Sequence, residues 1–73
     1  MDKLRALKNL GLSDREIDIY LALLELGPSS AGLVISKCTM QNSVFHVCVK
    51  RLVSNGLVGY IKRGRTKVYT ACN

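Results

Sequence analysis

Residues 28–56 read PSSAGLVISKCTMQNSVFHVCVKRLVSNG, a stretch with two runs of helical periodicity separated by a short polar turn. The first run predicts a helix over 29–38, which starts near two serines that can cap it. The second run predicts a helix over 41–55, which begins at a glutamine or asparagine cap and is closed by Gly56. Two helices joined by such a short turn indicate a helix-turn-helix.

The segment before this stretch predicts two more helices. Leucines at helical spacing indicate a leading helix over 1–10. The sequence SDRE then matches a capping box, in which the Ser13 hydroxyl and the Glu16 carboxylate satisfy each other's backbone N–H groups. This cap starts a helix over 13–26 that is apolar on two sides, so it must be central or must also face a second subunit.

The segment after Gly56 changes to a composition typical of strands. Residues 57–71 place β-branched and aromatic side chains on both sides of Gly64, which predicts a β-hairpin with this glycine at its tip. The expected fold is therefore mainly α with a small β-hairpin. It is a winged helix-turn-helix of three to four helices and a two-stranded wing, formed by a single domain over 1–73.

Charge is distributed unevenly along the 73 residues. The first 26 residues contain all five acids and four bases, which gives 4 − 5 = −1. From Gly27 onward there are seven bases and no acid, so this part carries +7 and the chain carries 7 − 1 = +6. Such asymmetry favours a nucleic-acid or acidic-membrane partner over a neutral small molecule.

Two segments resemble the N-terminal winged-helix domain of the TrmB-type, sugar-sensing transcriptional regulators found chiefly in archaea. They read LGLSDREIDIYLALLELGPSSAG and VFHVCVKRLVSNGLVGYIKRGRTKVY and cover nearly the whole chain. The family pattern has, in order, a GLS cap, a tyrosine-leucine run, a GP-S stop and restart, and a GLV entry to the wing. Here these motifs stand at positions 11–13, 20–21, 27–29 and 56–58.

The resemblance implies binding of double-stranded DNA, usually as a dimer, with a recognition helix in the major groove and the wing against the backbone. The sequence ends at Asn73, so the effector-binding domain of the larger regulators is absent from it, and no small-molecule effector site is expected. The expected protein is a cytoplasmic DNA-binding regulator that lacks its own ligand domain. An alternative is the excised DNA-binding domain of a longer effector-sensing regulator.

The helix over 41–55 is expected to read DNA with its outward face. At 100° per residue, Val49, Leu52 and Cys48 fall on the same side as Phe45 and are predicted to face the core. The opposite side and its flanks fit a major groove, which accepts one helix. The candidate DNA-binding residues of the helix-turn-helix are Ser30, Gln41, Asn42, Ser43, His46, Val47, Lys50 and Arg51.

The hairpin tip carries four cations in six residues without an acid, which is more than solubility requires. Cations so close together repel one another unless a counter-charge is present, so phosphate contact is expected. An arginine at the tip can also enter a narrow minor groove. The candidate DNA-binding residues of the wing are Lys62, Arg63, Arg65 and Lys67.

Other classes of function are disfavoured. The only histidine has no carboxylate after residue 25 to orient it, and no Gly-rich phosphate loop follows a strand, so catalysis is not expected. Cys38, Cys48 and Cys72 occur singly and are expected to be reduced, buried thiols. His46 and Cys48 point about 200° apart on a helix, so no metal or cofactor is expected. No apolar run is long enough to span a membrane.

Two further hypotheses concern apolar residues. The outward set Leu33, Val44 and Val47 would suit a winged helix that binds another protein, which is the alternative to DNA binding. A homodimer is also expected. Its interface is predicted from the second apolar stripe and the leading leucines, which comprise Ile19, Leu23, Leu26, Leu4 and Leu7.

Overall fold

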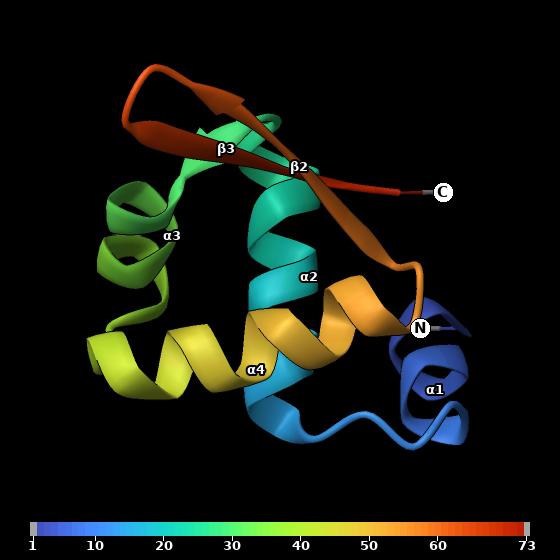
Figure 1. Ribbon diagram of the computed structural model, residues 1–73. Coiled ribbons are helices and arrows are strands. Elements are labelled where there is room, and N and C mark those ends of the chain that lie inside the picture. Colours follow the sequence, from blue (N-terminus) through green and yellow to red (C-terminus); the bar gives the residue numbers. More distant parts are fainter. Residues whose placement is uncertain (1, 73) are drawn as a thin grey trace.

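The computed structural model describes residues 2–72, without the side chains at positions 2–4 and 6 (Figure 1). Four helices and a three-stranded antiparallel sheet form a winged helix-turn-helix, which confirms the expected fold class. None of the helices in this part of the chain is long and apolar enough to cross a membrane. The elements in chain order are α1 (Asp2–Asn9), α2 (Asp14–Leu26), β1 (Ser29–Ser30), α3 (Ala31–Cys38), α4 (Asn42–Ser54), β2 (Val58–Arg63) and β3 (Thr66–Ala71).

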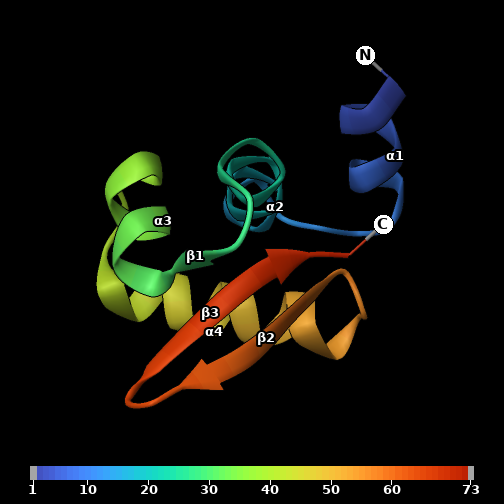
Figure 2. The same ribbon diagram turned by 90° about the horizontal axis from the view of Figure 1, so that it is seen from above.

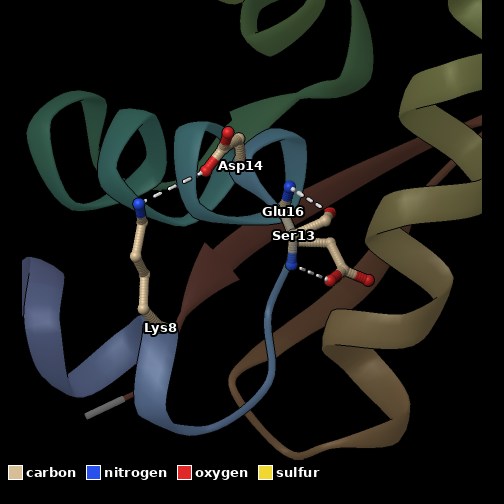
Figure 3. Close-up of polar contacts among 4 residues, drawn as sticks. All are labelled: Lys8, Ser13, Asp14 and Glu16. Carbon is tan, nitrogen blue, oxygen red and sulfur yellow. Dashed lines mark hydrogen bonds and ion pairs between the residues drawn. The ribbon is translucent and has the colours of Figure 1, made fainter.

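The predicted capping box starts α2. The Ser13 hydroxyl accepts from the Glu16 backbone N–H at 3.3 Å, and Glu16 Oε1 accepts from the Ser13 backbone N–H at 2.7 Å (Figure 3). An exposed ion pair of 3.8 Å between Lys8 and Asp14 joins α1 to the same end of α2. The two hydrogen bonds of the capping box satisfy two of the free N–H groups at the start of the helix, and they join residues that are only three apart in the chain.

The sheet contains one strand that the sequence did not predict. Its order is β1-β3-β2, and Ser29 and Ser30 pair with Tyr69 and Val68 of β3 (Figure 2). The expectation of a helix from residue 29 was therefore wrong at its first two residues, and the helix begins at Ala31. Ser30 is extended, with φ −74° and ψ 163°, and its hydroxyl caps α3 by accepting from Leu33 N–H. A cap residue in the β region can pair with a neighbouring strand while it starts a helix.

Strands β2 and β3 form the predicted hairpin. Arg63 pairs with Thr66, so Gly64 and Arg65 alone make the turn. Gly64 has a φ of +62°, which matches the first central residue of a type II′ turn, where glycine is preferred. The tip of the hairpin projects away from the helices in both views (Figures 1 and 2).

The hydrophobic core lies between α2, α4 and the inner face of the sheet. Phe45 of α4 is fully buried, and its ring meets the ring of Tyr69 edge-on at 5.5 Å. The Tyr20 hydroxyl donates to the Cys72 carbonyl at 3.0 Å, which ties the end of β3 to α2. The buried apolar residues are Leu7, Leu12, Ile17, Ile19, Tyr20, Ala22, Leu23, Val34, Phe45, Val49, Leu52, Val58 and Tyr69.

The residues proposed for a dimer interface are mostly inside the chain. Ile19 and Leu23 are 0% and 1% exposed, and Leu7 is also buried, so the predicted interface was wrong for these three. The reason is that α2 is the central helix, with α1, α3 and α4 around it (Figure 1). Leu26, at 42% exposure, remains at the surface, while the side chain of Leu4 lies outside the described residues.

Candidate nucleic-acid interface

Helix α4 presents a mixed polar and apolar face to solvent. Ser43, Val47 and Lys50 are exposed, and Val47 reaches 65%. On the opposite side Phe45 is buried together with Val49 and Leu52, as the helical spacing predicted. The buried apolar face fixes the rotation of the helix about its axis, so the outward face is determined by packing. Cys48, which was predicted to be a core residue, is only half-buried at the edge of the core.

The start of α4 differs from its expected capping. Gln41 is the N-cap residue, but its side chain makes no capping hydrogen bond, so the predicted side-chain cap is wrong. The Gln41 carbonyl still accepts the first helical bond, from Phe45 N–H at 3.0 Å. Gln41, Asn42 and Ser43 are all exposed. Their amide and hydroxyl groups are the kind that bind base edges or phosphate oxygens.

The four cations of the hairpin tip are exposed and are not paired with any acid among the described side chains. Lys62 stands directly opposite Lys67 in the strand register, and like charges in that position destabilise a hairpin. The Lys67 ammonium lies 4.7 Å from the centre of the Tyr60 ring, a cation–π contact. Strand alternation puts Tyr60 on the same face as Lys62, but sequence reasoning did not single it out.

Residues from three segments meet around one hollow. Ser30 at the start of α3, His46 of α4, and Arg65 and Lys67 of the hairpin line a depression of about 360 Å³. All four were candidate DNA-binding residues, and the fold brings their side chains to one place. Two of them are cations that belong to the acid-free half of the chain, so the hollow suits an anionic group.

Arg51 differs from the other candidate cations because it has a partner. Its Nε–H donates to Glu16 Oε2 at 3.1 Å, and the Glu16 side chain is only 1% exposed. The carboxylate that closes the capping box therefore also holds the second half of α4 against the start of α2. Arg51 thus carries a compensated charge, and a structural role accounts for its position. The capping box predicted where Glu16 would lie, but nothing local pointed to Arg51.

The thiols do not form a reactive site. Burial, and next the charge of Glu16, raise the pKa of the Cys48 thiol. Burial, followed by the charge of Asp18, raises the pKa of the Cys38 thiol. Both groups are therefore held in the protonated form, which is a poor nucleophile and a poor metal ligand. Within the described part of the chain, no three His, Cys, Asp or Glu residues are grouped so as to hold a metal ion.

Comparison with known proteins identifies this arrangement of helices and hairpin. Residues 7–73 match the family described as sugar-specific transcriptional regulator TrmB. The chain belongs to this family. The matched part corresponds to the N-terminal DNA-binding domain of TrmB-type regulators, which confirms the resemblance seen in the sequence. No curated protein matches the chain significantly.

Proposed function

We propose that this TrmB-family chain binds double-stranded DNA through α4 and the hairpin tip. The outward face of α4 enters the major groove, and the tip contacts the phosphate backbone or the adjacent minor groove. Sequence preference comes from the exposed residues at the start and on the outer face of α4. Most of the affinity comes from phosphate contacts of the hairpin, because that is where unpaired positive charge is concentrated.

The observation that carries this proposal is the projecting, acid-free tip beside an exposed helix face. Arg63 and Arg65 lie at the very end of the hairpin, and both side chains are exposed. His46 of α4 shares a hollow with Arg65 and Lys67, so helix and hairpin border one continuous surface. A duplex lying on this surface would meet both elements. Among the described side chains, the bases Lys8, Lys37 and Arg51 are instead paired with acids.

The test compares two double variants by fluorescence anisotropy over a range of salt concentrations. We expect Arg63→Ala combined with Arg65→Ala to lower the slope of log K against log salt by about 1.8, that is about 0.9 for each lost phosphate contact. The matched control is Arg5→Ala combined with Lys8→Ala. It removes the same charge from α1, which lies at the far side of the molecule from the tip in both views (Figures 1 and 2).

The control variant should keep the slope of the wild-type chain. An equal loss of affinity in both double variants would mean that only net charge matters, and it would refute the assignment to the tip. A selection of bound duplexes from a random pool then tests sequence preference. If α4 reads bases, the selected duplexes share a motif, and replacement of Ser43 or Lys50 changes it.

Homodimerisation is a further part of this proposal, on a surface other than the stripe that proved to be buried. Helix-turn-helix dimers bind two half-sites about one helical turn apart, so a dimer predicts that the selected motif is palindromic. Light scattering in the presence and absence of the selected duplex measures the mass directly. Monomers in both conditions, together with a single non-repeated motif, would refute the dimer but leave DNA binding intact.

A second candidate function is supported by an apolar groove on α4. Ser43, Val44, Val47 and Cys48 line this groove, which has a volume of about 280 Å³ and an almost wholly apolar lining. Such a groove would suit a protein partner if the chain does not bind DNA. A gel shift against random duplex at low salt separates the two functions, because a folded chain that shifts no duplex supports the protein partner.

A further inference from the structure

His46 lies between two neighbouring hollows at the junction of α4 with the hairpin. The first hollow, of about 360 Å³, also involves Ser30 and Arg65. The second, of about 320 Å³, lies against the next turn of α4 and involves Lys50. His46 and Lys67 border both hollows, so the imidazole is placed where the two depressions meet. It is the only histidine in the chain and its side chain is exposed.

Every charged group that faces His46 from the surrounding elements is a cation, as far as side chains are described. Lys50 comes from α4 itself, and Arg65 and Lys67 come from the hairpin. Ser30 and the start of α3 contribute only uncharged residues, and no carboxylate among the described side chains lines either hollow. Three cations without a counter-charge repel one another, so an anion that enters the hollow relieves this repulsion.

Contacts between aromatic rings hold the two sides of the hollow in place. Lys67 rests on the Tyr60 ring, and Tyr60 in turn packs against Tyr69 with ring centres 5.7 Å apart. Tyr69 meets Phe45 edge-on at 5.5 Å, and Phe45 meets His46 edge-on at 5.3 Å. The ammonium and the imidazole are therefore linked through three rings, of which Phe45 and Tyr69 are buried. A site fixed in this way binds its ligand without first ordering its own side chains.

We propose that the junction of the two hollows, at His46, binds one phosphate group of a DNA strand and that His46 binds it in the protonated form. This inference rests on the proposed DNA binding, and it adds that the chain takes up a proton when it binds DNA. A protonated imidazole donates from both ring nitrogens, and its hydrogen bonds to a phosphate oxygen are charge-assisted. Histidine is the side chain that ordinarily gains its proton between about pH 5 and 8. DNA binding therefore takes up a proton from solvent at His46.

Proton uptake makes DNA affinity depend on pH with a known sign. Because the complex holds more protons than the free chain, lowering the pH strengthens binding, by up to about tenfold per pH unit for one proton. Lysine and arginine side chains ordinarily titrate well above neutral pH, so residues of these types are not a source of such dependence. The phosphodiester stays anionic over the same range.

The test measures affinity for one duplex between about pH 6 and pH 8 at constant ionic strength, with a dye insensitive to pH. We expect the affinity of the wild-type chain to fall at least about threefold as the pH rises across this range. His46→Gln keeps an N–H donor but cannot gain a charge, so its affinity should stay constant. Lys50→Gln is the matched control, which should bind more weakly but keep the pH dependence of the wild-type chain.

Calorimetry of the wild-type chain in two buffers of different ionisation enthalpy counts the protons directly, so the test does not depend on any variant folding. Uptake of a fraction of a proton or more near neutral pH supports the proposal. Salt-sensitive DNA binding without proton uptake overturns it while leaving the proposed function intact. Failure of the folded wild-type chain to bind any duplex at low salt overturns the proposed function itself.

A final experiment titrates the chain with inorganic phosphate alone and follows the NMR resonances of the His46 ring. If phosphate shifts these resonances at low millimolar concentration and DNA binding takes up no proton, the hollow is a site for the free anion and the proposal is wrong. If DNA perturbs the resonances and inorganic phosphate does so only at far higher concentration, the duplex is the source of the phosphate.

Discussion

Removal of the Glu16 carboxylate should destabilise the fold far more than a typical change at a charged residue. Glu16 is 1% exposed and accepts two hydrogen bonds, from Ser13 N–H at 2.7 Å and from Arg51 Nε–H at 3.1 Å. Each bond to a charged group contributes about 1.5–3 kcal/mol. The Arg51 side chain is 63% exposed, so water screens the second bond and we place it at the low end of that range.

Glu16→Ala removes both bonds and is expected to cost about 3–4.5 kcal/mol of unfolding free energy. Since 1 kcal/mol corresponds to about 4–8 °C in Tm for a domain of this size, the melting temperature should fall by more than about 10 °C. Glu16→Gln keeps an oxygen that can accept from Ser13 N–H but turns an amide towards Arg51. We expect this variant to lose about 1–2 kcal/mol. Urea titration and thermal melting followed by circular dichroism measure both values.

Glu25→Gln is the matched control, because it makes the same chemical change in an ion pair of similar geometry. Glu25 lies 2.9 Å from Lys37, a shorter distance than the Glu16–Arg51 pair, but its side chain is 70% exposed. Its replacement should therefore change stability by less than about 0.5 kcal/mol. If Glu16→Gln and Glu25→Gln cost the same, burial does not determine the strength of these pairs and the reasoning is refuted.

Two further predictions concern the hairpin and the thiols. Lys62→Glu places an acid opposite Lys67, so the free energy of unfolding should rise by up to about 1 kcal/mol and the Tm with it. DNA affinity should fall, because the variant loses a cation of the tip. Thermal melting and fluorescence anisotropy measure the two effects, and a decrease in both stability and affinity would contradict this prediction. Because burial raises the pKa of both Cys38 and Cys48, the native chain should react with iodoacetamide near pH 8 more slowly than the unfolded chain, and faster as the pH rises. Equal rates in the native and urea-unfolded chains, measured by mass spectrometry, would be evidence against this shift.

The positions of the elements could be predicted because they depend on short-range interactions. The capping box at Ser13 and Glu16 joins residues three apart, and Gly64 provides the backbone conformation that its own turn requires. The buried face of α4 follows from its apolar spacing. These features determine the helices, the hairpin and their order, and this order is enough to predict a winged helix.

The candidate site was predicted only as separate pieces. The sequence indicated cations at the hairpin tip and exposed residues on α4, but it did not show that His46 shares a hollow with Arg65 and Lys67. It also treated Arg51 as a free cation, although the fold pairs it with Glu16. These partners lie far apart in the chain, so no periodicity or spacing links them.

The sequence by itself determined where the helices and the hairpin form, where positive charge gathers and which family pattern the chain follows. Only the tertiary structure decided that Ile19 and Leu23 are core residues, that Ser29 and Ser30 form a strand beside β3, and which cations remain unpaired. The physical reason is that capping, turns and amphipathic spacing act within a few residues. Burial and ion pairing depend instead on which distant segments the closed chain brings together.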